Sequence, residues 1–510
     1  MRRSLVAATV ASVLLLASAC GGSADGSSGS AGGDELTLAA VTPPSSFAIG
    51  EMAQSGPEDH YYQAVYDTLL KLDEDGQPAA NLVTDWSYDA TGTRLSLTLR
   101  DDVTFSDGTP FDAAAVKANL ETAKTKTGEA GTALAAIASV EVVDPTHADV
   151  VLSRPDPALE QSLARSSGYM ASPAALSNPD LATAPVGSGP YVLDADASTA
   201  GSTYVYTRNA DYWDAADFPY DSLEIRFLDD TTAILNGLRS GEINGVSGGT
   251  SDVTTGAQNA GLTVTKYTNG GIEGVYLWDR DGALAPALGD VRVRQAINYA
   301  MDRETIVKTV KGGLGEPTVQ VFGPSSAAYD ESLEDSYPYD VDKAEQLMAE
   351  AGYADGFDMT IADFSPVYPD EQAAMTEAFA SIGIDVTYAP ITGDQVVGSI
   401  IGGQWPANFF NLTAGSPFEM IGLTLTPQSP FNPFKTADPE VDRLVQQAQS
   451  TSGDEQAAAL QELNRYLVDQ AWFAPWDAAE GTYITTKDVA VTAVPGVSVP
   501  PLTDLEPAGS

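Results

Sequence analysis

The chain has 510 residues, of which 43% are hydrophobic and 19% are charged, enough apolar sequence for the cores of several domains. Its 71 Asp and Glu residues outnumber 25 Lys and Arg residues, and the formal net charge of −46 excludes nucleic-acid binding because phosphates would be repelled. A single cysteine and two histidines, His60 and His147, exclude a disulfide framework and a cysteine-built zinc site, so no metal or cofactor is expected.

The first twenty residues have the layout of a secretory signal. Arg2 and Arg3 precede the apolar run 6–16, which is too short to span a bilayer, and small residues lead to Cys20. This layout resembles a bacterial lipobox, which implies that 1–19 is a signal peptide and that Cys20 is lipidated after cleavage. An ordinary signal peptide with an incidental cysteine is the alternative, but the position of the only cysteine favours the lipoprotein.

A flexible tether is expected after the anchor. Residues 21–34 (GGSADGSSGSAGGD) have no apolar face to bury and would reach about 20 Å on average. No later segment contains the run of about eighteen apolar residues that a spanning helix requires. We therefore expect an extracytoplasmic protein held at the outer face of the cell membrane only through lipid on Cys20.

The rest of the chain alternates between strand and helix patterns, which predicts an α/β protein. Strands are expected at 35–41, 69–72, 77–82, 93–100, 140–143, 148–152, 204–207 and 223–228. Helices are expected after Asp112, at 231–240, 291–300 and 341–351, and after Asp438 and Asp454. The Asp-rich segment 73–76 reads as a hairpin turn, because it lacks the further oxygen ligands of a calcium-binding EF-hand.

Eight segments carry motifs in a fixed order. They are 66–70 (YDTLL), 82–86 (LVTDW), 97–111 (LTLRDDVTFSDGTPF), 186–191 (VGSGPY), 208–213 (RNADYW), 238–243 (LRSGEI), 290–304 (DVRVRQAINYAMDRE) and 339–357 (YDVDKAEQLMAEAGYADGF). In order and spacing these motifs resemble the family 5 extracellular solute-binding proteins of ABC importers, which include dipeptide, oligopeptide and nickel binders. Most of the motifs read as scaffold: Gly187 and Gly189 would supply unusual backbone angles, and Tyr212 and Trp213 would pack on the first lobe.

The resemblance implies a two-lobed periplasmic-binding-protein-like fold of type II, with an extra inserted subdomain and a cleft that closes by a hinge. The expected parts are lobe I at 35–60, 187–270 and 479–510, the inserted subdomain at 61–186, and lobe II at 271–478.

The ligand is the open question. In peptide-binding members a cleft loop of lobe II carries a Trp and then an Asp that pairs with the peptide's ammonium group. The corresponding segment 409–418 (FFNLTAGSPF) has neither, and Glu419 is the nearest acid. A buried ammonium without a partner is costly, so the alternatives to a peptide are an opine-like conjugate, a short oligosaccharide or a polyamine-like cation. Nickel chelation is disfavoured because the two histidines lie in the inserted subdomain or at its edge.

The resemblance also indicates where cleft contacts lie. Four aromatic residues, Phe47, Trp278, Trp405 and Trp476, look exposed and could stack on a ligand, although most tryptophans in a chain of this size belong to a core. The candidate ligand-binding residues are Ser45, Ser46, Phe47, Ser247, Tyr276, Trp278, Asn411, Thr413, Gly415 and Trp476.

These patterns predict a monomeric substrate-binding lipoprotein that delivers a small solute or peptide to an ABC permease and its ATPase. A secreted hydrolase is the remote alternative, since the chain lacks GxSxG and HExxH motifs but contains 71 acids, among which a catalytic carboxylate pair would have no motif. A sensor or adhesin built on the same binding fold is the other alternative.

Overall fold

The computed structural model describes residues 35–510 except 53–55, 75, 127–128, 249–250, 367, 392–394, 493 and 510. The predicted signal peptide, Cys20 and the tether lie outside the described residues. Within the described part of the chain, no helix combines the length and the apolar character needed to cross a membrane.

A mixed sheet of nine strands forms the centre of the fold. Its order is β16-β12-β17-β11-β1-β10-β9-β8, with β13 also paired to β17. β1 is parallel to both of its neighbours, and the other pairs are antiparallel. The strands are β1 (Glu35–Ala40), β8 (Tyr191–Thr199), β9 (Thr203–Arg208), β10 (Ser222–Phe227), β11 (Gly245–Gly248), β12 (Thr263–Leu277), β13 (Glu316–Pro317), β16 (Ala407–Thr413) and β17 (Phe473–Thr485).

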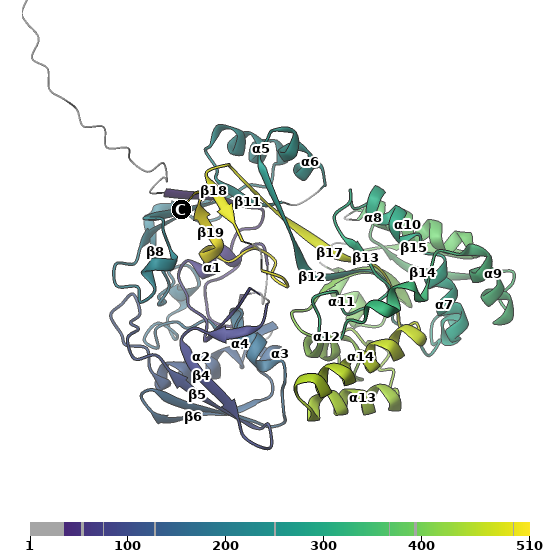
Figure 1. The fold of residues 1–510 in the computed structure, drawn as a ribbon, viewed down its shortest axis with the longest axis horizontal. Coiled ribbons are helices and arrows are strands. Elements are labelled where there is room, and N and C mark those ends of the chain that lie inside the picture. Colours follow the sequence, from purple (N-terminus) through teal and green to yellow (C-terminus); the bar gives the residue numbers. More distant parts are fainter. Residues whose placement is uncertain are drawn as a thin grey trace, which may run out of the picture. The chain divides into compact units, whose positions relative to one another are not determined.

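Two long strands, β12 and β17, connect the two halves of this sheet. One end of β17 pairs with β11, whereas the other end of β12 pairs with β16. Figure 1 shows both strands running from the region of α5 and α6 to the region of α7 and α8. Their pairing is interrupted between Thr268 and Ile272, where the register shifts. These two strands therefore cross between the lobes.

The segment predicted as the inserted subdomain contains its own antiparallel sheet, ordered β4-β5-β7-β6, against which α2 packs. Leu95, Leu97 and Leu99 of β5 are buried in alternation, as predicted. The elements are α1 (Asp59–Gln63), β2 (Leu70–Leu72), β3 (Pro78–Ala80), β4 (Val83–Tyr88), β5 (Arg94–Leu99), α2 (Ala113–Ala123), α3 (Glu129–Ala133), β6 (Ile137–Asp144), β7 (His147–Leu152) and α4 (Leu159–Leu163).

Helices dominate the second half of the chain, and aspartates start several of them. Asp340 accepts a hydrogen bond from the Lys343 backbone N–H at 2.9 Å and so caps the helix expected at 341–351. The last long helix begins at Gly453, so Asp454 lies in its first turn instead of preceding it. The remaining elements are α5 (Thr231–Ser240), α6 (Ser251–Asn259), α7 (Val291–Tyr299), α8 (Arg303–Thr309), α9 (Val341–Glu350), β14 (Phe357–Asp363), α10 (Pro369–Ser381), β15 (Ile384–Pro390), α11 (Val396–Ile401), α12 (Pro417–Thr424), α13 (Pro439–Ser450), α14 (Gly453–Asp469), β18 (Val489–Val491) and β19 (Leu505–Pro507).

The apolar cores are separate. One large core joins residues from 36–225 to Tyr267, Tyr483 and the C-terminal segment 489–505. Two further cores are built from 272–478, one on each side of the strands that cross between the lobes. The predicted two-lobed α/β fold is therefore confirmed, while its boundaries to the residue remain a prediction.

The glycines of the VGSGPY motif are needed for a different reason from the predicted one. The prediction of unusual backbone angles is wrong, since neither Gly187 nor Gly189 has a positive φ. A Cβ on Gly187 would lie 1.9 Å from the carbonyl oxygen of Val65, and one on Gly189 would lie 2.5 Å from the carbonyl carbon of the same residue. Close packing of two backbone segments, not torsion, requires glycine at these positions.

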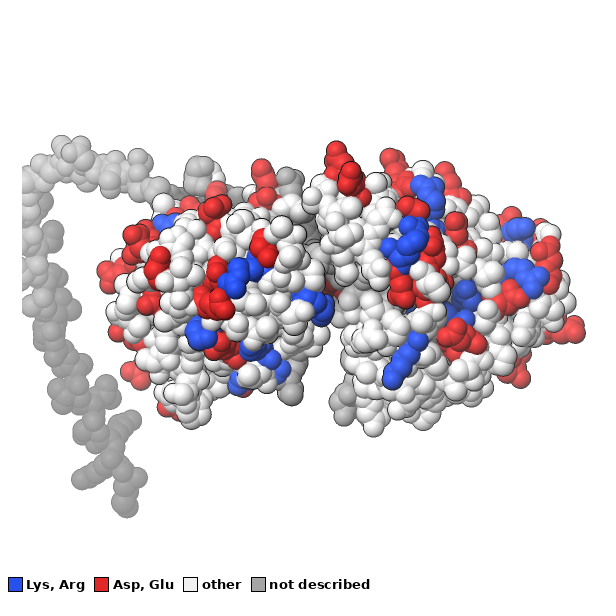
Figure 2. Space-filling view, turned by 90° about the horizontal axis from the view of Figure 1, so that it is seen from below, with Lys and Arg blue, Asp and Glu red and all other residues white. Residues whose placement is uncertain are grey.

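The acidic excess is a surface property. Among the described residues, the buried carboxylates are Glu58, Asp67, Glu273, Asp279 and Asp477. Figure 2 shows Asp and Glu spread over the drawn face with Lys and Arg interspersed. Such a solvated acidic surface favours solubility and does not by itself define a ligand.

Candidate functional site

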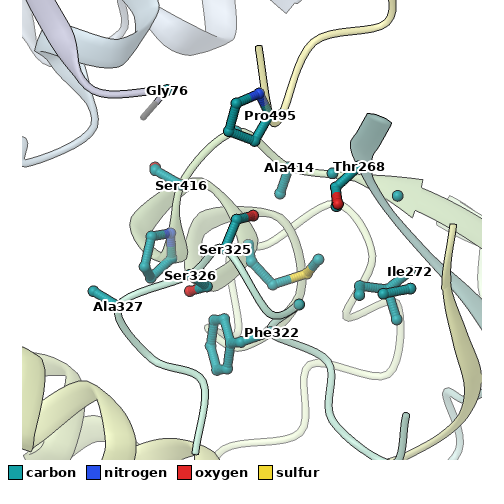
Figure 3. A pocket seen from close by; sticks show the side chains of 18 of the residues that line it. Gly76, Thr268, Ile272, Phe322, Ser325, Ser326, Ala327, Ala414, Ser416 and Pro495 are labelled. Carbon is teal, nitrogen blue, oxygen red and sulfur yellow. The ribbon is translucent and has the colours of Figure 1, made fainter. Parts of the chain in front are cut away.

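A small cavity lies where lobe I, lobe II and the crossing strand β12 meet, and we call it the cleft cavity. Its volume is about 110 Å³. Figure 3 shows Gly76, Pro495, Ser325 and Ser416 arranged around it on separate chain segments. The lining residues are Gly76, Gln77, Gln161, Thr268, Gly270, Gly271, Ile272, Val321, Phe322, Gly323, Ser325, Ser326, Ala327, Ala414, Gly415, Ser416, Pro417, Met420, Ala478, Pro495 and Gly496.

The interrupted part of β12 forms one wall of the cleft cavity. Gly270 has a φ of +77°, and a Cβ there would lie 3.2 Å from the carbonyl oxygen of Ala414 and 3.3 Å from Gly496 Cα. A β-carbon on Gly271 would lie 2.7 Å from the side-chain oxygen of Asn411. Glycine at 270 therefore lets the backbones of β12, Ala414 and Gly496 approach one another beside the cleft cavity, and glycine at 271 leaves room for the Asn411 side chain.

The lobe II wall is the start of α12. The Ser416 hydroxyl caps this helix by accepting from the Glu419 N–H at 3.2 Å, and the Glu419 carboxylate accepts from the Gly415 N–H at 2.6 Å. This arrangement is a variant of the capping box, in which the carboxylate accepts from the residue before the N-cap instead of from the N-cap itself. Glu419, the acid nearest in sequence to the expected ammonium site, therefore helps to cap helix α12.

The wall of the cleft cavity is uncharged. Within the described part of the chain, every lining residue is glycine, serine, threonine, glutamine, proline or an apolar residue. Backbone groups and hydroxyls can bind a polar solute there, and Ile272, Phe322 and Met420 supply apolar contact. A ligand's ammonium group would find no carboxylate on this wall.

A larger groove of about 800 Å³ lies within lobe I and the inserted subdomain. It is bordered by residues 59–81, 164–169, 212–219 and 492–507. Because lobe II contributes nothing to its wall, hinge closure would not enclose a ligand in it. We therefore take the cleft cavity as the candidate site.

The predicted binding residues of the 409–418 loop lie at or beside the cleft cavity. Gly415 lines it. Thr413 pairs with Gly271 on β12, and Asn411 donates a hydrogen bond of 2.9 Å from its side chain to Glu273. Of these three residues only Gly415 contributes to the wall, and the ligand-binding role of the loop remains a prediction.

Phe47, Trp278 and Trp476 are buried, which is the core alternative to ligand stacking. Each side chain is at most 2% exposed and belongs to an apolar core. Trp476 stacks on a phenylalanine ring of β16 with centroids 5.1 Å apart, and Trp278 stacks on Tyr276 at the same distance. Trp405 is half-buried. None of these rings lines the cleft cavity, and their contact with a ligand remains a prediction.

The three predicted serines lie in other surroundings. Ser46 donates to the carboxylate of Glu51 at 2.9 Å, and Ser45 lies 3.5 Å from the hydroxyl of Tyr62. Ser247 is on β11, paired with Tyr483. They do not line the cleft cavity, so their role in ligand binding remains a prediction.

One part of the site was missed from sequence. The loop 321–327 contributes Ser325 and Ser326, and its Gly-Pro-Ser-Ser sequence signals a small polar turn without indicating a cleft. Arg165 lies beside the cleft cavity but lines the larger groove, and its guanidinium donates to the Gly496 carbonyl at 2.6 Å.

A buried charged cluster lies beside the crossing strands. Lys311 forms a 2.6 Å ion pair with Glu273 on β12 and lies 3.8 Å from Glu371. Asp477 on β17 is fully buried, and neither of its carboxylate oxygens accepts a hydrogen bond. Burial, reinforced by the charge of Glu273, raises the pKa of Asp477 to about 8.

Replacing Asp477 by Asn is expected to stabilise the protein increasingly as pH rises. The folded-state pKa lies above the usual value, so the folded protein retains a proton that the unfolded chain releases between about pH 4 and pH 8. The wild type therefore loses stability through that window, by at most about 1.4 kcal/mol per pH unit, and the Asn variant avoids this loss. Urea unfolding at pH 5, 6, 7 and 8 measures the difference.

The exposed carboxylate of Asp358 on β14 provides the matched control. Asp358→Asn should leave the pH dependence of unfolding unchanged. A pH-independent difference between Asp477→Asn and the wild type would contradict the assigned titration.

Comparisons with known proteins agree with this fold. The chain is 32% identical over 305 residues to the glutathione-binding protein GsiB of Salmonella paratyphi A, covering 59% of this chain and 58% of the relative's length. Two solved structures cover 93% of this chain: HbpA2 from Haemophilus parasuis (TM-score 0.81, 19% identity, 99% of that chain) and a dipeptide-binding protein from Pseudoalteromonas sp. SM9913 with Met-Leu (TM-score 0.75, 21% identity, 100% of that chain). The model of the middle region of bacterial extracellular solute-binding proteins, family 5, matches residues 77–429. With this match over more than half of its length, the chain belongs to the family 5 bacterial extracellular solute-binding proteins.

Proposed function

We propose that this protein is the substrate-binding component of an ABC importer, which captures a small solute in the cleft cavity and delivers it to a membrane permease. The observation that carries the proposal is a cavity lined jointly by lobe I, lobe II and β12. A ligand bound there contacts both lobes at once, so its binding energy favours the closed arrangement that a permease can recognise.

The solute is a di- or oligopeptide or a related molecule. Relationship to a glutathione-binding protein supports this class. The cavity of about 110 Å³ is smaller than the roughly 300 Å³ or more of a typical ligand pocket, so lobe I and lobe II must move apart to admit the solute. The uncharged wall disfavours a polyamine-like cation, and it leaves an opine or an oligosaccharide as the alternative ligand.

The protein acts extracytoplasmically as a monomeric lipoprotein without enzymatic activity. The lipobox-like sequence that ends at Cys20 supports the lipid anchor, and the tether 20–34 gives the folded part room to reach a permease. The lobes take the predicted ranges, 35–60, 187–270 and 479–510 for lobe I, 61–186 for its inserted subdomain, and 271–478 for lobe II.

Deletion of the gene tests the proposal even while the solute is unidentified. The strain and its parent grow in a medium containing peptides, amino-acid conjugates and sugars, and mass spectrometry follows which solutes disappear. We expect one solute class to persist in the deletion culture while the others are consumed normally. Equal depletion of every solute by both strains would contradict a role in import.

A further inference from the structure

Two acidic residues face each other on the strands that cross between the lobes. Glu273 of β12 and Asp477 of β17 are directly opposed partners in the antiparallel pair. Their side chains therefore leave the same face of the sheet, with Cβ atoms about 5 Å apart. Both residues are buried, Glu273 with 5% of its surface exposed and Asp477 with none. We call this pair the carboxylate rung.

The carboxylate rung lies next to the wall of the cleft cavity. The neighbouring pair along the same two strands is Ile272 opposite Ala478, and both of these residues line the cavity. The register of β12 and β17 shifts between Thr268 and Ile272 and again directly after Glu273. These two pairs are thus separated from the regular ladder on both sides, so their pairing depends strongly on the side chains that they carry.

The two carboxylates of the rung have different surroundings. The Glu273 carboxylate accepts a hydrogen bond of 2.9 Å from Asn411 and forms an ion pair of 2.6 Å with Lys311. Neither oxygen of Asp477 has a hydrogen-bond partner among the described residues, and a Cβ on Gly315 would collide with its Oδ2. The Asp477 carboxyl is therefore packed against backbone, without a donor that would stabilise its anion.

Other buried carboxylates are satisfied by donors. Asp67 accepts from three side-chain donors, and Asp279 accepts from three backbone N–H groups. A carboxyl group without donors is far less costly to bury with a proton than as an anion. In agreement, burial, reinforced by the charge of Glu273, raises the pKa of Asp477 to about 8.

Acids outnumber lysines around the carboxylate rung, within the part of the chain that the structure describes. Glu371 of α10 lies 3.8 Å from Lys311 and adds a third carboxylate. Lys266 of β12 pairs with Glu480 of β17 at 3.0 Å and so serves another acid. Lys311 is therefore shared among three carboxylates, which leaves an excess of negative charge unless a proton is bound. Further ionisable groups on the elements packed around the rung are Tyr276 of β12, Glu316 of β13 and Tyr368 before α10.

We propose that the carboxylate rung is a pH-sensitive switch: a proton on Asp477 keeps β12 and β17 paired beside the cleft cavity, and its loss loosens the cavity wall at Ile272 and Ala478. With the proton bound, one negative charge lies beside Lys311, whereas without it two directly opposed carboxylates repel each other in a buried setting. The proposal deepens the solute-binding function proposed above, on which it rests, because it makes the wall of that site respond to pH.

The direction of the response follows from the proton balance. Opening of the rung hydrates Asp477 and returns its pKa to the ordinary value of about 4. Between about pH 4 and pH 8 the opened rung therefore binds fewer protons than the closed rung. Opening becomes more favourable as pH rises through this window, by at most about tenfold per pH unit, and levels off above about pH 8.

Hydrogen exchange of the full chain without any solute tests the switch. Amide exchange is followed by mass spectrometry at pH 6, 7 and 8 in peptides covering 268–278 and 474–482, and in a reference peptide covering β5, which belongs to a different core. Rates are divided by those of Asp477→Asn at the same pH, which cancels the intrinsic pH dependence of exchange. We expect the ratio to rise by about tenfold or more from pH 6 to pH 8 in the two rung peptides, and much less in β5.

Two further variants connect the effect to the carboxylate rung. Glu273→Gln keeps Asp477 but removes the charge opposite it, so the rise should be smaller than in the wild type. Asp358→Asn, at an exposed position of β14, should keep the full rise. If Asp477→Asn does not fold, protection of the rung peptides relative to β5 within the wild type, each corrected for its intrinsic rate, measures the same opening.

Two results would overturn the switch. One is a ratio that stays constant from pH 6 to pH 8, and the other is a rise in β5 as large as in the rung peptides, because the proton would then act on the whole fold. Either result leaves the solute-binding function standing, since no solute takes part in the measurement. Equal solute depletion by the deletion strain and its parent would contradict that function without changing the exchange rates.

Discussion

Replacing Gly415 by Leu is expected to abolish solute binding, by about a hundredfold or more in affinity. The added side chain would begin 2.2 Å from the guanidinium of Arg165 and project from the wall of a cavity of about 110 Å³. Overpacking of this kind costs about 1–3 kcal/mol, and the leucine also fills the volume that the ligand would occupy. Together these two effects correspond to a loss of affinity of about a hundredfold or more. Native mass spectrometry of the purified protein measures the fraction that carries a solute.

Gly422 on the same helix, α12, provides the control. A Cβ there meets nothing within 4 Å, and the residue is exposed. Gly422→Leu should keep the bound fraction of the wild type and its unfolding midpoint. Solute retention by Gly415→Leu at the wild-type level would place the binding site elsewhere.

Replacing Arg303 by Met is expected to destabilise lobe II by about 3 kcal/mol or more. The guanidinium is buried and donates to the carbonyls of Thr318, Pro475, Asn298 and Tyr337, and to the Asn298 side chain. Methionine fills similar space but leaves buried acceptors without donors. Pro475 lies on β17, so losing the hydrogen bond from Arg303 also removes a contact that holds one of the crossing strands.

Denaturant unfolding followed by tryptophan fluorescence measures this effect, and Arg443→Met is its control. Arg443 is exposed and pairs with Glu440 three residues earlier on α13, and solvent screens such a pair so strongly that its loss should hardly change stability. If both variants lost the same stability, the hydrogen bonds of Arg303 would not be the reason.

Local rules predicted the elements well because they depend on nearby residues. The helix 231–240 was predicted with the bounds it has, and Asp112 caps α2 through the Ala115 N–H at 2.9 Å. Alternation of leucines placed β5 and its buried face. Capping, alternation and turn chemistry operate within about four residues, so they can be read from the chain alone.

From the sequence, the site could be predicted only as a set of loops and strands, not as individual contacts. Part of the loop 409–418 lines the cleft cavity. A tryptophan looks the same in sequence whether it lies in a core or a cleft, and Trp278 and Trp476 lie in cores. Arg165 and Gly415 are 250 residues apart, and only the folded chain shows that one occupies the space left by the other. Contacts between lobes join residues that are far apart in the chain, so no local sequence pattern predicts them.

Complementation of the deletion strain tests the central claim most directly, namely that this chain imports a solute through the cleft cavity. The wild type, Gly415→Leu and Gly422→Leu are expressed in turn, and uptake of the solute that persists in the deletion culture is measured. We expect uptake with the wild type and with Gly422→Leu, and none with Gly415→Leu at equal protein levels. Uptake restored by Gly415→Leu, or by none of the three, would contradict the account.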